Sequence, residues 1–428
     1  MHPGKLFFVG LILTIIPDAV FAAGDNNAPM LLAGIPVEFI IFGLTLIGVA
    51  VFYKHTLLVS LIGLAAILVQ KLGFQNFNII SHLQNESSIL LNLLGLLLGF
   101  AILARLFEES HIPKILPKVL PDDWKGPFLL LVYIFILSAF LDNIAAALIG
   151  GSIALVVFRG KVHIGYLVAI VAASNAGGSG SVLGDTTTTM MWIDGISPLN
   201  VIHAYIAAIP ALLFFGVFAS IQQHKYHPIL KGKYKSPKID TVKLIICLLI
   251  LVGAVIANLL IDFTAAGVWA GILIGATLTK IDWKELQKAI PGTIFLLALT
   301  LTASMMPVDN LPSPSWQNCF SLGLVSSVFN NIPLTKLALD QGGYDWGMLA
   351  YCVGYGGSMI WFGSSAGVAI TNLYPGSGSV IRWVKGGWHV IVGYILGFII
   401  LYFTFGWQPE APHKPKNETK TEIISTSK

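Results

Sequence analysis

Long apolar runs of helical length recur along the whole chain, and they constrain its fold more than any other feature. A helix that crosses the hydrocarbon core of a bilayer needs about 20 predominantly apolar residues, and fewer where neighbouring helices or a thinner bilayer help. Runs of this kind lie at 31–52, 56–72, 89–106, 202–222, 243–262, 265–279, 291–306 and 388–405. The sequence therefore predicts an all-α polytopic membrane protein with the lipid bilayer as its surroundings.

The composition supports a membrane protein over a soluble one. Charged residues make up 11% of the chain and hydrophobic residues 55%, whereas ordinary soluble domains carry about 25% charged residues. The basic residues form no dense patch with interleaved aromatics, so we expect no nucleic-acid partner. The three cysteines lie in apolar segments without the C-x-x-C spacing of a metal site, and we expect no bound metal or cofactor.

Three longer apolar stretches are interrupted by polar residues or glycine at mid-depth. With their interruptions in brackets, they are 127–158 (141–143), 163–194 (174–192) and 319–373 (329–331 and 354–367). Irregular backbone inside a membrane leaves amides and carbonyls without partners, so it survives only where it lines protein or a water-filled cavity. Broken helices therefore indicate the working site of a transporter.

The distribution of Lys and Arg predicts a re-entrant hairpin at 127–158. Basic connections flank this stretch on both sides, and another follows 202–222. Since short basic connections favour the cytoplasmic face, the stretch must enter and leave on the same side. Asp142 and Asn143 would then lie at the tip of the hairpin.

A second hairpin is expected from the opposite face. The connection 308–318 contains no Lys or Arg and is expected outside, so 319–340 would enter from the outer face with Asn330 and Asn331 at its tip. Lys71, Lys336 and the lysines of the C-terminal tail fall outside in this topology and are exceptions to the rule.

An internal repeat agrees with the opposite orientation of the two hairpins. Each hairpin tip is followed by a glycine-rich interruption of similar pattern, Gly177-Gly178-Ser179 with Gly184-Asp185 in one half and Gly356-Gly357-Ser358 with Gly363-Ser364 in the other. Two such matches in the same order are the expected signature of an inverted-repeat transporter with two oppositely oriented re-entrant hairpins and two broken transmembrane helices.

These features divide the chain into six parts. The first 22 residues have one Lys, a short apolar run and a terminal Val-Phe-Ala, which suits a cleaved signal peptide; the alternative is an uncleaved first helix. We expect a signal peptide at 1–22, N-terminal scaffold helices at 23–88, the first inverted repeat at 89–222, a basic cytoplasmic loop at 223–242, the second inverted repeat with its leading helices at 243–405 and a polar tail at 406–428.

The glycine-rich interruption 174–192 has the chemistry to bind an ion. Glycine lets the helix unwind, freed carbonyls can coordinate a cation, and the N-terminus of the following half-helix attracts an anion. Hydroxyl groups add oxygen ligands for Na⁺ or for a carboxylate, and the candidates are Ser179, Ser181, Thr186 and Thr187.

Asp142 and Asp185 are the strongest candidates for an ion-binding role. A charged side chain inside a membrane costs about 2.5 to 3.5 kcal/mol on insertion scales, so it is a functional candidate by default. Two structural alternatives stay open: Asp185 caps the half-helix that follows it, and Asp142 is a satisfied carboxylate at the hairpin tip. Capping and ion binding are compatible.

The motifs of both halves resemble those of the NhaD-type sodium/proton antiporters. The motifs are SAFLDN (138–143), SNAGGSGSVLGDTTTTMMW (174–192), SSVFNNIPL (326–334), LAYCVGYGGSMIWFGSSAGVA (349–369) and GYILGF (393–398). That family belongs to the ion transporter superfamily, which also contains citrate and other carboxylate carriers with a citrate transporter-like domain. The resemblance covers about residues 30 to 405.

The resemblance implies a scaffold domain and a moving transport domain, and a homodimer. Carried over by position, the first half-site comprises Asp142, Asn143, Asp185, Thr186 and Thr187, and the second comprises Asn331, Ser364 and Ser365. The chain departs from the family pattern at three places. Asn330 replaces the usual Asp of the second tip, Ala145 to Ala147 replace threonines, and Ser179 to Leu183 replace an A-W-S-P-I segment.

The sequence thus predicts a cation-coupled secondary transporter of the bacterial inner membrane and not an enzyme. The leading interpretation is a sodium/proton antiporter in which Asp142 and Asp185 bind Na⁺ and H⁺ in competition. The alternative is Na⁺- or H⁺-coupled symport of citrate, a dicarboxylate or another anion, because the departures reduce negative charge and hydroxyl ligands. Inorganic cations or small carboxylates are the expected solutes.

Overall fold

The computed structural model of the chain describes residues 31–32, 34–52, 55–229 and 238–410. The expected signal peptide at 1–22 lies outside the described residues, and so do residues 411–428 of the expected polar tail. The described part is helical apart from one short antiparallel pairing of β1 (Leu31–Leu32) with β2 (Ile35–Pro36). The chain is therefore an all-α protein in its described residues, with this small hairpin before the first described helix.

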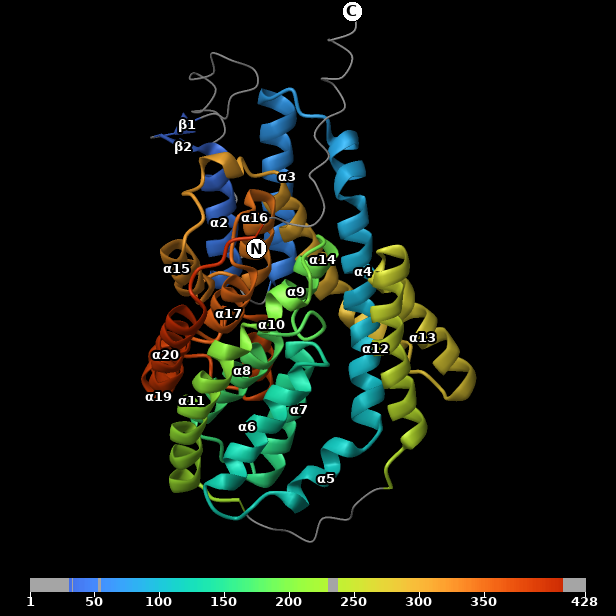
Figure 1. The fold of residues 1–428 in the computed structure, drawn as a ribbon, viewed down its shortest axis with the longest axis vertical. Helices are drawn as coiled ribbons and strands as arrows, with labels where there is room; N and C mark the ends of the chain where they lie inside the picture. The colour runs from blue at the N-terminus through green and yellow to red at the C-terminus, as the bar shows by residue number, and fades with distance from the viewer. Residues whose placement is uncertain (1–30, 33, 53–54, 230–237, 411–428) are drawn as a thin grey trace, which may run out of the picture.

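The helices follow one another through short connections (Figure 1). The first half contains α2 (Val37–Val51), α3 (Thr56–Phe74), α4 (Ile79–Glu109), α5 (Ile112–Val119), α6 (Lys125–Ser138), α7 (Asn143–Val157), α8 (Ile164–Ser179), α9 (Thr186–Ile193), α10 (Leu199–Ile202) and α11 (Tyr205–Tyr226). The second half contains α12 (Thr241–Ile261), α13 (Thr264–Leu278), α14 (Lys284–Ser304), the 3₁₀ turn η3 (Val308–Asn310), α15 (Trp316–Ser326), α16 (Asn331–Gln341), α17 (Trp346–Gly356), α18 (Ser365–Leu373), α19 (Val380–Gly386) and α20 (Trp388–Phe405).

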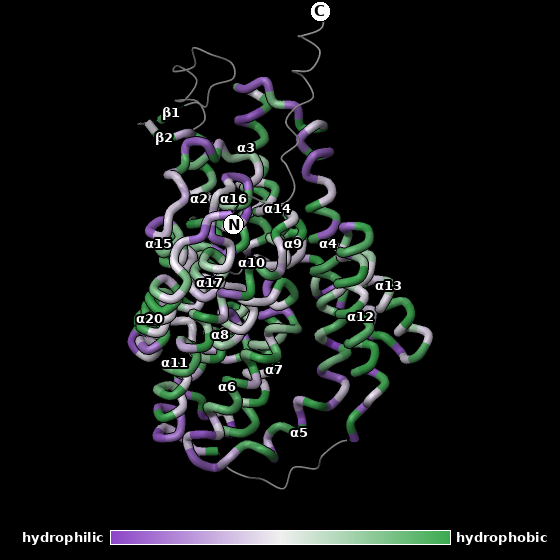
Figure 2. The backbone as a smooth tube through the Cα atoms, viewed as in Figure 1, coloured by the Kyte–Doolittle hydropathy of each residue, from purple (hydrophilic) through white to green (hydrophobic). Residues whose placement is uncertain are grey.

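Many of these helices have the length and composition of membrane spans. Within the described residues, six stretches are long and apolar enough to cross a bilayer, namely α3, α4, 199–226, α12, α14 and α20. Five shorter apolar helices accompany them, namely α2, α6, α7, α8 and α13. Apolar residues cover most of the long helices, while hydrophilic residues gather toward the two ends of the long axis (Figure 2). The chain is a multi-pass membrane protein.

Three helices begin six or more residues away from the starts of their apolar runs, namely α2, α4 and α14, of which α14 begins at Lys284 instead of residue 291. The first run was expected from residue 31, but α2 begins at Val37, because the chain first forms the β1–β2 pairing. The run expected from residue 89 belongs to a longer helix, α4, whose start is capped by Asn78; its Oδ1 accepts hydrogen bonds from the amides of Ile80 at 3.0 Å and Ser81 at 3.1 Å. The expected division between residues 88 and 89 thus lies inside α4.

The helices pack in two groups that meet along α4 and α14. Helix α4 packs against α12, α13 and α14, and α14 also packs against α3. In the second group α8 packs against α6, α7, α11 and α17. Figure 1 shows α4, α12 and α13 along one side of the molecule and α6, α8 and α11 along the other. Helices α8 and α17 are buried along almost their whole length, so the interruptions that follow them lie in the interior.

Candidate ion and substrate site

Two carboxylates cap helix N-termini in the first half of the chain. Asp142 precedes α7, and its Oδ2 accepts a hydrogen bond from the Ile144 amide at 3.1 Å. Asp185 precedes α9, and its Oδ1 accepts one from the Thr187 amide at 3.2 Å. Both carboxylates therefore lie where the helix offers partial positive charge and unsatisfied N–H groups. Capping, the structural alternative for Asp185, is present and uses one of its two oxygens.

Neutral side chains cap the matching helices in the second half. The Asn330 Oδ1 before α16 accepts from the Ile332 amide at 3.0 Å. The Ser364 Oγ before α18 accepts from the Gly367 amide at 3.2 Å. Four helix N-termini are thus capped in matched pairs, and only the first pair carries negative charge.

The two halves also correspond in a hydrogen bond near the end of the helix that precedes each capping residue. The Ser138 hydroxyl at the end of α6 donates to the Ser174 carbonyl of α8 at 2.5 Å. The Ser326 hydroxyl at the end of α15 donates to the Val353 carbonyl of α17 at 2.7 Å. Each hairpin is therefore attached to its neighbouring helix in the same way.

Close helix packing at these places needs glycine. A Cβ added at Gly177 would lie 2.1 Å from the carbonyl oxygen of Phe135, and one added at Gly356 would lie 2.1 Å from that of Gly323. Neither contact is sterically possible, so the glycines of both motifs bring α8 and α17 against the backbone of α6 and α15.

Asn175 joins the two halves of the candidate site. The Asn143 side-chain amide donates to the Asn175 Oδ1 at 3.0 Å, and the Asn175 amide donates to the Ser358 hydroxyl at 2.9 Å. All of this lies in the interior, and Asn175 is fully buried. Asn175 is not among the site residues predicted from the sequence. Its signal was an amide inside the apolar part of α8, directly before the glycine-rich interruption.

Two oxygen atoms beside this junction are buried without partners. Neither Asp185 Oδ2 nor Thr187 Oγ1 has a hydrogen-bond partner of normal geometry among the described residues, although the two side chains lie close enough to interact. Asp185 is 2% exposed and Thr187 is fully buried. Across from them, a Cβ added at Gly354 of α17 would lie 3.3 Å from Asp185 Oδ2. Buried polar atoms are normally paired. These oxygens could therefore bind a cation, and the carboxylate oxygen could instead bind a proton.

The remaining predicted residues hold the interruptions in place. The Ser179 hydroxyl donates to the Ala176 carbonyl at 2.8 Å, and the Ser181 hydroxyl donates to the Ala139 carbonyl at 2.6 Å, which ties the interruption to the hairpin tip. Asn330 donates to the Ser365 hydroxyl at 3.4 Å. Thr186 and Asn331 are both buried.

A cavity of about 640 Å³ leads to the first hairpin tip. It lies between α4 and α14 on one side and α7 on the other, and Asp142 and Ser365 are the predicted site residues that line it. Its other lining residues include Arg105, Glu108, Ile144, Leu148, Ser152 and Glu285. Asp142 therefore has a path out of the interior, whereas Asp185 does not line this cavity.

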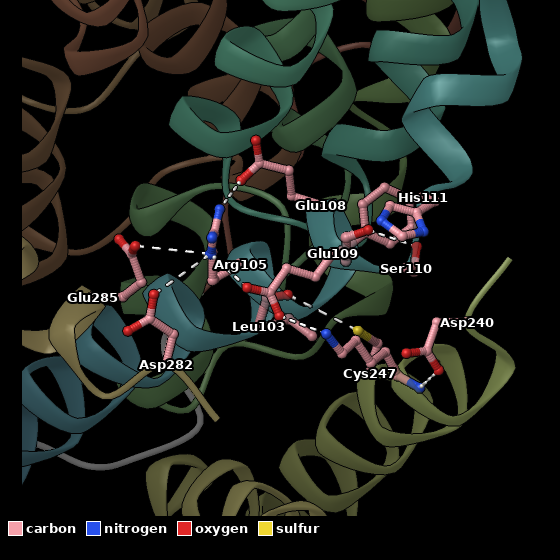
Figure 3. Close-up of polar contacts among 12 residues, drawn as sticks. Leu103, Arg105, Glu108, Glu109, Ser110, His111, Asp240, Cys247, Asp282 and Glu285 are labelled. Atoms are coloured by element: carbon pink, nitrogen blue, oxygen red, sulfur yellow. Dashed lines mark hydrogen bonds and ion pairs between the residues drawn. The ribbon is translucent and has the colours of Figure 1, made fainter. Parts of the chain in front are cut away.

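Charged side chains of both signs surround the far end of this cavity. Arg105 forms ion pairs with Glu108 and Glu109, each at 2.9 Å, and lies 3.9 Å from carboxylate oxygens of Asp282 and Glu285. Figure 3 shows Arg105 directed toward Glu108, Asp282 and Glu285. This cluster marks one end of α4, at the interface with water.

A polytopic helical protein whose interrupted helices bury polar groups beside an access cavity is a membrane transporter. The model of the citrate transporter (CitMHS) family matches residues 39–354, and the chain belongs to that family.

Curated relatives carry antiporter names. The chain is 26% identical over 287 residues to Sodium/proton antiporter 1 of Arabidopsis thaliana, an alignment that covers 56% of this chain and 49% of that protein. It is 25% identical over 346 residues to Sodium/proton antiporter 2 of the same plant, covering 68% and 80%. It is 24% identical over 327 residues to the Na(+)/H(+) antiporter NhaD of Halomonas elongata, covering 62% and 65%. The chain thus matches about half the length of the first of these relatives. The resemblance to NhaD-type proteins is confirmed, and family and relatives are transporters, not enzymes.

Proposed function

We propose that the chain is a cation-coupled secondary transporter of the bacterial inner membrane, and that it exchanges Na⁺ for H⁺. The observation that carries this proposal is a pair of buried oxygens, Asp185 Oδ2 and Thr187 Oγ1, that have no hydrogen-bond partner of normal geometry among the described residues. Asp142 lines the cavity and lies close enough to Asp185 for the two carboxyl groups to interact. A carboxylate that binds either Na⁺ or a proton gives exchange directly, because a protonated site releases Na⁺ and an occupied site releases its proton. The antiporter names of the relatives support the same solutes.

The proposal includes an inverted repeat with two re-entrant hairpins, α6–α7 and α15–α16. The matched caps and the matched serine and glycine contacts support this relation. We retain the repeats at 89–222 and 243–405 around the basic loop 223–242, and the scaffold at 23–88, which includes the first turns of α4. The interruptions after α8 and α17 are then equivalent broken spans of the two repeats.

We assign the cation to the first half-site. It comprises Asp142, Asn143, Asp185, Thr186 and Thr187, with Ser179 and Ser181 holding the interruption. In the second half-site Asn330, Asn331, Ser364 and Ser365 supply neutral groups, and the amide of Asn330 and the hydroxyls of Ser364 and Ser365 already take part in hydrogen bonds. Since hard cations prefer carboxylate and other oxygen ligands, one charged half-site favours one Na⁺ for each turnover.

A second candidate is Na⁺- or H⁺-coupled symport of citrate or another small carboxylate. The neutral caps of α16 and α18 favour it, because helix N-termini without a capping carboxylate attract an anion. The family description names citrate as well. In this case Asp142 and Asp185 would hold the coupling cation, and the second half-site would hold the carboxylate.

The proposed assembly is a homodimer in the membrane. Helix α12 supports this, because only 22% of its most apolar 18-residue stretch is buried within the chain. This is the lowest share among the six candidate spans of the described residues. Its outward side carries exposed residues such as Leu248 and Leu259, which would contact lipid or a second copy.

The proposed function is tested by measuring the pH gradient of everted membrane vesicles after addition of Na⁺, Li⁺ or citrate. Wild-type vesicles are compared with Asp185→Asn, which keeps a good capping residue and removes the charge. The matched control is Asp240→Asn, which makes the same change at the cap of α12, where Asp240 accepts from the Lys243 amide at 3.2 Å.

We expect Na⁺ to release protons from the wild type and the control but not from Asp185→Asn. If Na⁺ and Li⁺ had no effect and citrate moved protons instead, the antiporter proposal would be wrong and carboxylate symport would take its place.

A further inference from the structure

A buried lysine connects α16 with the first turns of α4. The Lys336 ammonium lies 2.7 Å from an oxygen of Asp340 on the same helix and 3.0 Å from an oxygen of Glu86 on α4. Its side chain is 2% exposed. An unpaired charge buried at such a place is strongly destabilising, so the ion pair holds α16 against α4. We call Lys336, Glu86 and Asp340 the ion-pair triad.

The triad and the mouth of the cavity lie toward opposite faces of the membrane. Glu86 is near the start of α4, and Arg105 is near its end. At 1.5 Å per residue the two are about 28 Å apart along the helix, which is close to the roughly 30 Å thickness of a bilayer core.

The two hairpin helices differ at equivalent positions. When Asp142 is matched with Asn330, Lys336 of α16 corresponds to Leu148 of α7, and Asp340 corresponds to Ser152. Leu148 and Ser152 both line the open cavity, whereas Lys336 and Asp340 form the triad with Glu86.

Helix α14 shows the same asymmetry. It packs directly against α16, whereas the cavity separates it from α7. The site is thus open toward the Arg105 face and closed toward the Glu86 face.

We infer that the ion-pair triad is the latch that keeps the Glu86 face closed while the cavity is open at the Arg105 face. Opening the Glu86 face requires α16 to leave α4 and α14, which separates Lys336 from Glu86. Asp340 moves with Lys336, because both belong to α16, so the lysine keeps one partner during the movement. The inference depends on the proposed alternating access of the site, and it assigns Lys336 to the conformational change and not to ion binding.

The test uses cysteine accessibility in a background without the native Cys247, Cys319 and Cys352. Ser152→Cys reports the cavity and is probed with a membrane-impermeant maleimide in everted vesicles. Ile332→Cys reports the closed face and is probed in right-side-out vesicles, because Ile332 is 3% exposed and corresponds to Ile144, which lines the cavity.

We expect Lys336→Met to lower the labelling rate at position 152 and to raise it at position 332, each by about tenfold, since losing one partner of a buried pair is strongly destabilising to the latched state. Glu86→Gln breaks the same bridge from the other helix and should act in the same direction. Lys336→Arg keeps the charge and should restore the wild-type pattern.

The matched control is Glu38→Gln. Glu38 is buried and lies 3.7 Å from Lys71, but this pair joins α2 to α3 and does not reach the hairpins. The Glu38→Gln variant should therefore leave the labelling rates at positions 152 and 332 unchanged.

Wild-type labelling at both positions in monodisperse Lys336→Met and Glu86→Gln proteins would overturn the latch, as would an equal shift in Glu38→Gln. The assay needs no transported solute, so a failure of the Na⁺ assignment in the vesicle experiment leaves it interpretable.

Discussion

At the scale of single residues, the site combines satisfied structural bonds with a few unsatisfied oxygens. Asn175 uses both ends of its amide, one toward Asn143 and one toward Ser358, so it fixes the distance between the two halves. One oxygen of Asp185 accepts the capping hydrogen bond, and the other has no partner of normal geometry in the part of the chain that the structure describes. The first residue builds the site and the second is available to bind.

Replacing Asn175 by Ala should weaken ion binding beyond its effect on folding. The change leaves the amide of Asn143 and the hydroxyl of Ser358 without their partner, at about 1 to 3 kcal/mol for each unsatisfied buried group. We expect at least about a tenfold higher Na⁺ concentration for half-maximal proton release.

The control for this prediction is Asn92→Ala. Asn92 is equally buried and accepts from the Ala265 amide at 2.8 Å between α4 and α13. The Asn92→Ala variant should have lower thermal stability, and the Na⁺ concentration for its half-maximal proton release should be unchanged. An Asn175→Ala protein that needs the same Na⁺ concentration as the wild type would show that the Asn143–Asn175–Ser358 hydrogen bonds do not determine the affinity of the site for Na⁺.

At the scale of helices, the interruptions could be predicted, and the contacts that cross between the halves could not. Polar residues at 141–143 and glycines at 174–192 stand out in apolar surroundings because hydrocarbon does not tolerate irregular backbone. The ion pair of Lys336 with Glu86 gave no such signal, since Glu86 lies in the polar first turns of α4 beyond its apolar run. Lys71 and Lys336, the exceptions to the positive-inside rule, are both paired with carboxylates.

The close packing of α8 on α6 should make Gly177→Ala strongly destabilising. A methyl group there would lie 2.1 Å from the Phe135 carbonyl oxygen, and relieving such overpacking costs about 1 to 3 kcal/mol or more. Gly43→Ala in α2 is the control, because a Cβ at that position has nothing within 4 Å. There we expect unchanged or slightly higher stability, since Ala is the better helix former by about 1 kcal/mol. Thermal unfolding of the purified proteins in detergent measures both, and equal melting temperatures would contradict the packing argument.

At the scale of the whole molecule, the proposed transport cycle depends on which side of α4 and α14 is open. The cavity gives Asp142 a route to the Arg105 face, while the packing of α16 closes the other face. The sequence predicts two hairpins of opposite orientation, but it could not predict which of them borders a cavity, because in the proposed cycle one chain adopts both states in turn.

Filling the cavity should therefore stop transport without touching the capping carboxylates. Leu148 lines the cavity and is 37% exposed, whereas Leu155, also on α7, does not line it and is 39% exposed. We expect Leu148→Trp to reduce Na⁺-driven proton release by at least about tenfold, since the indole occupies the route to Asp142 and hinders the closure of α7 onto α4 and α14. Leu155→Trp adds the same side chain where it can extend away from the cavity, and its proton release should stay within about twofold of the wild type. Equal activities of the two tryptophan variants at matched protein levels would mean that solutes do not use this cavity.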